Sequence, residues 1–186
     1  MKKPNAKERI LETAAGLFFQ RGYSGVGINE IIEKAGTAKA SFYQHYPSKE
    51  SLCEAWLKSV HEKSEAFAET LLGGPGSASE KAAAYFEHLE RLLVESGYRG
   101  CPYSNTGALS VEKSPGICRQ IRLHKESTRR RFRQIAALAI ADPAEAELVG
   151  DTLFVLQSGA MGEAQNLRET WPVEVARRAA VALLER

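Results

Sequence analysis

Several features that would place the chain in a special class are missing from its 186 residues. Its 25 lysine and arginine residues and 23 aspartate and glutamate residues leave a net charge of only +2. This balance excludes a strongly basic coat for nucleic acid but allows a local basic patch. The longest purely apolar run, AALAIA from Ala136, is far shorter than the roughly 20 residues that span a bilayer. No secretory signal pattern is visible, and we expect a soluble, cytoplasmic protein.

Cysteine is scarce and shows no pairing pattern. The three cysteines, Cys53, Cys101 and Cys118, are odd in number and form no CxxC motif, so neither a disulfide framework nor a zinc knuckle is indicated. Glycine-rich phosphate loops, nucleophile motifs and metal-ligand spacings are missing as well. We therefore expect buried free thiols, no cofactor and no metal site.

What the sequence does contain is helical periodicity along almost its whole length. Apolar residues recur every three or four positions between residues 6 and 22. Ser77 with Glu80 forms a capping box, and Asp142 followed by proline is a strong helix start. The expected helices cover residues 6–22, 29–34, 39–46, 48–72, 77–96, 115–140, 142–168 and 170–186. The connection after residue 96 is rich in turn residues, with a short helix within it as the alternative. Without alternating strand patterns or internal repeats, the predicted fold class is all-α.

The first fifty residues have the outline of a helix-turn-helix. Two short predicted helices flank a tight turn at residues 35–38, and the second one holds aromatic and polar side chains in the sequence AKASFYQHY. Small residues at its start allow close approach to a DNA groove. Residues 1–50 carry eight lysines and arginines against five acids, and the remainder carries 17 against 18. The basic excess therefore lies on the predicted DNA reader.

The segment GYSGVGINEIIEKAGTAKASFYQHYPSKESL resembles the DNA-binding domain of TetR-family transcriptional regulators. The resemblance covers roughly residues 6–55. Its matching positions are Gly22, Tyr23, Ile28, Ile31, Ala35, Gly36, Tyr43, His45, Tyr46, Lys49 and Leu52. Gly27, Ala38 and Ala40 depart from the family, which often has a hydroxyl residue at the first two positions and glycine at the third. These departures remove one or two phosphate contacts and weaken the cap of the second helix.

The resemblance implies a DNA-binding domain over residues 1–50 and a helical effector-binding and dimerisation domain over residues 51–186. It implies a ligand-responsive regulator without enzymatic activity, most often a repressor that a small molecule releases from a pseudo-palindromic operator. The residues implied for contacts with base edges or sugars are Lys39, Ser41 and Phe42. Those implied for the phosphate backbone are Tyr43, His45 and Lys49, with the Lys2–Lys3 arm adding to them. Packing within the domain is the alternative role for the two aromatic residues.

The C-terminal domain is expected to hold a small-molecule effector, since the family's members bind one there. The candidate residues combine aromatic and polar groups, as ligand pockets do: Trp56, Tyr85, Phe86, Tyr103, Asn105, His124, Phe154, Gln157 and Met161. Side chains of these types at helical spacing also form ordinary cores, which is the alternative. The segment RGCPYSNTGAL resembles a segment that lies near the ligand cavity in some members.

The last two predicted helices carry apolar faces with small residues between them. The apolar residues are Leu148, Leu153, Val155, Leu156, Val175, Ala179, Val181, Ala182 and Leu183, and the small ones are Gly159, Ala160, Gly162 and Ala164. The family's dimers form a four-helix bundle from this region, and we expect a homodimer. A monomer that buries these faces internally is the alternative.

Two other functions are alternatives to a transcriptional regulator. An enzyme with Cys101 as nucleophile, His124 as base and Asp151 as orienting group is conceivable, but no motif supports it. A small-molecule binder without DNA affinity is also conceivable, given the departures at Gly27, Ala38 and Ala40.

The run from Arg119 to Arg133 holds seven lysines and arginines and one glutamate. We interpret this run as a solvated helix surface, with attraction for an anionic ligand or for DNA as the alternative.

Overall fold

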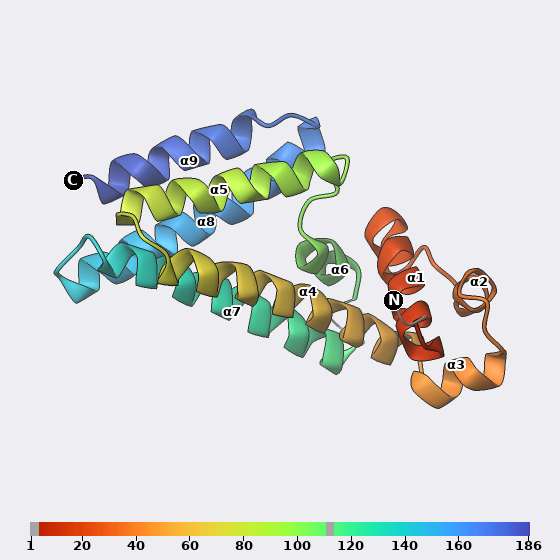
Figure 1. The fold of residues 1–186 in the computed structure, drawn as a ribbon. Coiled ribbons are helices and arrows are strands. Elements are labelled where there is room, and N and C mark those ends of the chain that lie inside the picture. The colour runs from red at the N-terminus through yellow and green to blue at the C-terminus, as the bar shows by residue number, and fades with distance from the viewer. Residues whose placement is uncertain (1–3, 111–113) are drawn as a thin grey trace. The chain divides into compact units, whose positions relative to one another are not determined.

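The computed structural model describes residues 4–110 and 114–186, and every regular element in these ranges is an α-helix (Figure 1). In chain order the helices are α1 (Ala6–Arg21), α2 (Ile28–Lys34), α3 (Lys39–His45), α4 (Lys49–Gly73), α5 (Ala78–Glu95), α6 (Pro102–Ser110), α7 (Pro115–Ala137), α8 (Pro143–Leu167) and α9 (Trp171–Leu184). The all-α prediction is confirmed. Only α6 was not assigned a range in advance, because its glycine- and asparagine-containing sequence resembles a turn.

The capping signals in the sequence set the starts of three helices. Ser77 accepts a hydrogen bond from the backbone N–H of Glu80, whose carboxylate accepts one from the N–H of Ser77 in return. Asp142 accepts from the N–H of Glu145 in the same way at the start of α8. At the start of α4, Ser48 accepts from the N–H of Ser51 at 3.0 Å. Each cap satisfies a donor that the first helical turn leaves open, so short local motifs are enough to place these starts.

The chain forms two compact units, each with its own apolar interior. Unit 1 comprises Met1–Glu62 and Pro102–Leu123, and unit 2 comprises Lys63–Cys101 and His124–Arg186. The predicted division at residue 50 falls at the end of the helix-turn-helix, whereas unit 1 also takes in the first half of α4, α6 and the beginning of α7. Both α4 and α7 therefore contribute residues to both units.

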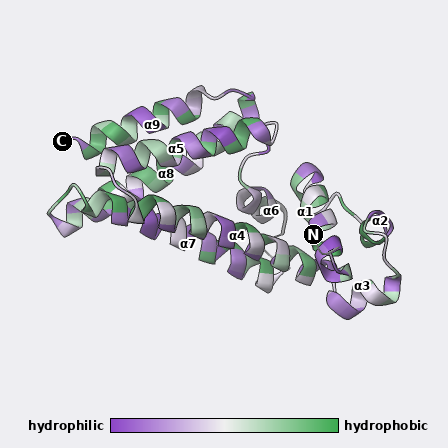
Figure 2. Ribbon diagram, viewed as in Figure 1, coloured by the Kyte–Doolittle hydropathy of each residue, from purple (hydrophilic) through white to green (hydrophobic). Residues whose placement is uncertain are grey.

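The core of unit 2 lies among α5, α7, α8 and α9. Figure 1 shows α5, α8 and α9 side by side, and α9 contacts both of the other two. Phe86 and Phe132 are completely buried, and Tyr85 packs edge-on against Phe132 with ring centroids 4.8 Å apart. Hydrophilic and hydrophobic residues alternate along these helices in Figure 2, as expected for helices that bury one face. None of the helices in the described ranges is long and apolar enough to cross a membrane.

A buried lysine joins the end of α4 to the start of α5. Lys81 is only 5% exposed, and its Nζ donates hydrogen bonds to the carbonyl oxygens of Leu71 at 2.9 Å, Leu72 at 3.3 Å and Gly74 at 2.5 Å. The last carbonyl groups of a helix have no partners within the helix and carry partial negative charge. The ammonium group supplies those partners, which explains how a lysine can be buried at this position.

Candidate functional site

The turn between α2 and α3 places the predicted recognition helix in unit 1. Gly36 adopts a left-handed conformation with φ of 59°, which glycine reaches without strain. Arg9 on α1 donates from Nε to the carbonyl oxygen of Ala35 at 3.2 Å and so fixes the turn against α1. Arg21 donates to both carboxylate oxygens of Glu30 on α2, at 2.8 and 2.7 Å. The helix-turn-helix is therefore held from two sides by α1.

Phe42, which the resemblance implied as a DNA contact, is instead the core residue of α3. It is 0% exposed, lies edge-on to Tyr43, and has the ring of Tyr46 at a centroid distance of 6.5 Å. A completely buried ring presents no surface to a base or a sugar, which favours packing over DNA contact as the role of Phe42. Burial of this aromatic side chain is what attaches the short helix to unit 1.

The remaining predicted DNA contacts are accessible. Lys39 and Tyr43 are exposed, Tyr43 by 42%, and Ser41, His45 and Lys49 are half-buried. All five lie on α3 or in the first turn of α4. Lys2 and Lys3, which were expected to extend this surface, lie outside the described residues. The part of the chain that was predicted to hold the DNA backbone thus presents cations, hydroxyls and an imidazole on neighbouring elements.

Lys49 is positioned by an aromatic ring that the sequence did not link to it. Its Nζ lies 4.4 Å from the centroid of the Tyr23 ring, and partial burial lowers the pKa of Lys49. Tyr23 in turn packs against Phe18, and Phe18 against Trp56, with centroid distances of 5.7 and 5.6 Å. A cation over an aromatic face is restrained electrostatically. The lysine at the start of α4 is therefore held in place by the core of unit 1.

Neither short helix of the helix-turn-helix has a side-chain cap, which for α2 agrees with the weak cap expected at Gly27. Gly27 and Ala38 occupy the N-cap positions of α2 and α3, and neither makes a side-chain capping hydrogen bond. A hydroxyl or carboxamide side chain at such a position satisfies one of the open N–H groups of the first turn. Both helices are consequently held by burial of Ile31 and Phe42 rather than by caps.

The structure divides the predicted effector-binding residues between the two units. Trp56, Tyr103 and Asn105 belong to unit 1, where the Tyr103 hydroxyl donates to the carbonyl oxygen of Leu57 at 2.7 Å. Six others belong to unit 2 and lie on α5, α7 and α8: Tyr85, Phe86, His124, Phe154, Gln157 and Met161. Among these, Tyr85, Phe86 and Met161 are part of the apolar core. The nine residues thus do not form one cluster within a unit.

An ion pair between a buried arginine and a partly exposed glutamate in unit 2 was missed, because the two residues are far apart in the sequence. Arg131 is 3% exposed, and its guanidinium donates to Glu65 Oε1 at 2.5 Å. Ser127 donates to the same carboxylate oxygen at 2.7 Å, and the guanidinium lies 3.5 Å from the Tyr85 hydroxyl. Burial raises the pKa of Tyr85. Polar groups of α4, α5 and α7 therefore meet inside unit 2, next to one of the predicted effector contacts.

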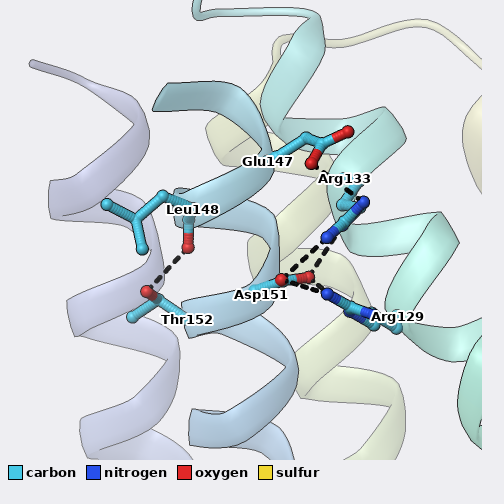
Figure 3. Close-up of polar contacts among 6 residues, drawn as sticks. All are labelled: Arg129, Arg133, Glu147, Leu148, Asp151 and Thr152. Carbon is cyan, nitrogen blue, oxygen red and sulfur yellow. Dashed lines mark hydrogen bonds and ion pairs between the residues drawn. The ribbon is translucent and has the colours of Figure 1, made fainter. Parts of the chain in front are cut away.

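Other members of the basic run on α7 are also paired, so the interpretation as a solvated surface holds only in part. Arg129 and Arg133 each donate two hydrogen bonds to the carboxylate of Asp151 on α8, at 2.5–2.8 Å (Figure 3). Figure 3 also shows Glu147, one turn earlier on α8, reaching Arg133 at 3.1 Å. We call Asp151 with Arg129 and Arg133 the α7–α8 clamp. The two guanidinium groups hold the pKa of Asp151 well below its usual range.

Two residues of the enzymatic alternative have other partners. Both carboxylate oxygens of Asp151 accept hydrogen bonds from Arg129 and Arg133. Cys101 Sγ lies 3.9 Å from Lys125 Nζ, so the thiol has a lysine as its neighbour. The free thiol of Cys53 is buried, and burial raises its pKa to about 12. In the described part of the chain, no group of three metal-ligating side chains comes together.

The α7–α8 clamp leads to a prediction about acid stability. Asp151→Asn removes the charge that both guanidinium groups face, and we expect it to lower the free energy of unfolding by about 1 kcal/mol near neutral pH. Because the folded pKa of Asp151 is lowered, its contribution is complete above the unfolded pKa near 3.8 and is lost as the pH falls toward the folded value. Urea denaturation of both proteins between about pH 7 and pH 3 should therefore show converging stabilities.

Glu147→Gln is the matched control for the clamp, since Glu147 also reaches Arg133 but its side chain is 62% exposed. An exposed ion pair of this kind contributes little, and we expect a change below about 0.5 kcal/mol. A difference between Asp151→Asn and the wild-type protein that stayed constant down to pH 3 would contradict the clamp.

Comparisons with known proteins agree with the helix-turn-helix. Residues 10–56 match the family model for bacterial regulatory proteins of the tetR family. The HTH-type transcriptional repressor NemR of Escherichia coli (strain K12) is 28% identical over 118 residues, which are 61% of this chain and 55% of NemR. An uncharacterised HTH-type transcriptional regulator in the lacX 3′ region of Lactococcus lactis is 30% identical over 110 residues, 54% of this chain and 53% of the relative. The chain thus spans about half the length of these relatives.

Solved structures extend the similarity in fold to almost the whole chain. The crystal structure of a TetR transcriptional regulator from Legionella pneumophila has a TM-score of 0.84 at 23% identity and covers 99% of this chain and 100% of its own. The reduced form of E. coli NemR has a TM-score of 0.80 at 22% identity, with 94% of both chains covered. These relatives are transcriptional regulators, and none of them points to an enzyme family. Residues 10–56 thus match the DNA-binding domain of the tetR family of bacterial regulatory proteins, and almost the whole chain shares the fold of solved TetR-family regulators.

Proposed function

We propose that the protein is a homodimeric repressor that binds a pseudo-palindromic operator and leaves it when a small molecule binds the larger helical region. The accessible surface of α3 and the first turn of α4 carries this proposal. Lys39, Ser41, Tyr43, His45 and Lys49 supply donors and positive charge there, and phosphate contacts of this kind fix the register of a protein on DNA. The name of NemR, a transcriptional repressor, supports repression as the mode of action.

Exposed apolar residues on α8 and α9 support the proposed homodimer. Leu148 and Val155 on α8 are 68% and 65% exposed, and Trp171 and Val175 on α9 are 49% and 54% exposed. Gly159 and Gly162 have open space where a side chain would start, so a second helix can approach closely. Other residues of the predicted faces, such as Leu153, are buried internally. The two helices therefore serve the core of unit 2 on one side and a second copy on the other.

The effector is proposed to bind in unit 2, among α5, α7 and α8. Six of the predicted contacts lie on these helices, and the Arg131–Glu65 pair brings polar groups next to Tyr85. Binding there changes DNA affinity only if the effector favours one arrangement of the helices over another. The coupling is reciprocal, so operator DNA must weaken effector binding by the same factor.

Footprinting of the purified protein on DNA that flanks its own coding sequence tests the function, with and without cell extract. We expect protection of two half-sites related by a two-fold axis, lost when extract supplies the effector. Protection of a single half-site would contradict the dimer. If neither this DNA nor a pool of random duplexes were bound specifically, the chain would be a binding protein without regulatory function.

The double variant Lys49→Ala, Tyr43→Phe tests the proposed phosphate contacts. We expect it to bind every DNA sequence about 10- to 100-fold more weakly and to lower the slope of log affinity against log salt concentration by about 1. Fluorescence anisotropy titrations at several salt concentrations measure both quantities.

Lys58→Ala is the control for charge alone, because Lys58 lies further along α4 and is 66% exposed. It should leave the affinity and the salt slope close to those of the wild-type protein. Equal salt slopes for the double variant and this control would show that Lys49 and Tyr43 do not hold phosphate.

A further inference from the structure

The burial of Phe42 defines which side of α3 faces away from unit 1. Successive residues of a helix are turned by about 100°, so Ala40 and Gln44 each lie about 160° from Phe42. Both are exposed, and they stand one turn apart on the outward side of the helix. The face of α3 that points directly away from the core is therefore the line from Ala40 to Gln44.

The previously implied contacts lie to the sides of that line. Lys39 and His45 are turned by only about 60° from Phe42, and Ser41 and Tyr43 by about 100°. Tyr43 lies edge-on against the Phe42 ring with a centroid distance of 5.3 Å, which holds it at the flank. When a helix enters the major groove, its flanks meet the sugar-phosphate walls and its outward face meets the base edges. The flanking residues thus suit the backbone, and Ala40 and Gln44 suit the bases.

We propose that Gln44 is the specificity-determining residue of the recognition helix and that it reads an adenine in each half-site. This inference rests on the proposed DNA-binding function. The carboxamide of Gln44 has a donor and an acceptor side by side, and adenine presents the complementary N7 acceptor and N6 donor in the major groove. Ala40 has only a methyl group, so the first turn of α3 comes close to the groove floor, where that methyl packs against the C5-methyl of a thymine.

Selection of bound duplexes from a randomised pool tests the assignment, with the full chain as wild type, Gln44→Ala and Gln44→Glu. The wild-type protein should enrich an adenine at one position of each half-site. Gln44→Ala should lose the preference at that position alone and bind the wild-type site about 10- to 100-fold more weakly. Gln44→Glu should shift the preference to cytosine, because a carboxylate accepts a hydrogen bond from cytosine N4.

Gln20→Ala is the matched control, because Gln20 is an exposed glutamine on α1, outside the recognition helix. It should select the same sites as the wild-type protein, and thermal unfolding should show that all variants fold. If the Gln44 variants kept the wild-type preference at every position, Gln44 would not read a base while the regulator function stood. If the wild-type protein enriched no sequence, both the inference and the proposed function would fail.

Discussion

Replacement of Gly150 by alanine is expected to destabilise the protein by about 2–4 kcal/mol, although alanine is the better helix former. Gly150 lies on α8 where this helix crosses α7. A Cβ atom at this position would lie 2.5 Å from Arg133 Cα and 2.6 Å from Arg133 N. Backbone atoms cannot turn aside as the end of a side chain can. The substitution must therefore push α7 and α8 apart, with loss of packing along the crossing.

Helix propensity and the steric clash at Gly150 change the stability in opposite directions, so the two effects can be distinguished. Glycine to alanine in a helix interior is favourable by about 1 kcal/mol where space is available. Gly16 on α1 has nothing within 4 Å of its would-be Cβ, so Gly16→Ala should leave the stability unchanged or raise it. Denaturant titrations of both variants give the two free energies. Similar behaviour of Gly150→Ala and Gly16→Ala would mean that the α7–α8 crossing is not close-packed.

Glu65→Ala is expected to cost about 3 kcal/mol, because it leaves the guanidinium of Arg131 buried without its carboxylate. Arg131 is 3% exposed, and its guanidinium also donates to the hydroxyls of Ser64 and Tyr85 at 3.4 and 3.5 Å. Such neutral acceptors at long distance cannot replace a charged partner at 2.5 Å. The destabilisation arises from the cation that remains in the interior rather than from the loss of an attractive pair.

A second substitution distinguishes these two origins. In the Glu65→Ala background, Arg131→Met removes the unpaired charge and fills much of its volume, so more than half of the lost stability should return. Glu62→Ala, on the same helix, is the control, since Glu62 is 64% exposed and its ion pair with Lys58 is 3.9 Å long. It should change the free energy of unfolding by less than about 0.5 kcal/mol. No recovery in the double variant would show that Glu65 stabilises the fold by other means.

The sequence was sufficient for the helices because their start signals are local. Ser77 with Glu80 and Asp142 with its following proline act within one helical turn, and the structure has both caps as predicted. The turn at Gly36 was predictable for the same reason. By contrast, α6 begins at Pro102 without a clear apolar periodicity, so its sequence resembles a turn as much as a helix.

The site residues were harder to predict because their roles depend on partners distant in the chain. Phe42 is an aromatic residue within the predicted recognition helix, where a DNA contact is expected. Only the packing of α3 shows that its ring is buried. Arg131 and Glu65 are separated by 66 positions, and Arg129 and Asp151 by 22. The sequence of the basic run does not indicate which of its arginines and lysines lie next to a carboxylate on another helix. Gln44 was overlooked because the side of α3 that faces outward is known only once the buried side is known.

The lysine that ties α4 to α5 changes how the glycine-rich turn between them should be understood. Gly-Gly-Pro-Gly sequences usually serve as joints about which neighbouring segments pivot. Here Lys81 donates to the carbonyl groups of Leu71, Leu72 and Gly74 at once, and these bonds restrain a turn of three glycines and one proline. As long as these bonds persist, the last turn of α4 and the first turn of α5 travel as one rigid body. A displacement of the end of α4 would then be transmitted to the start of α5 through the turn.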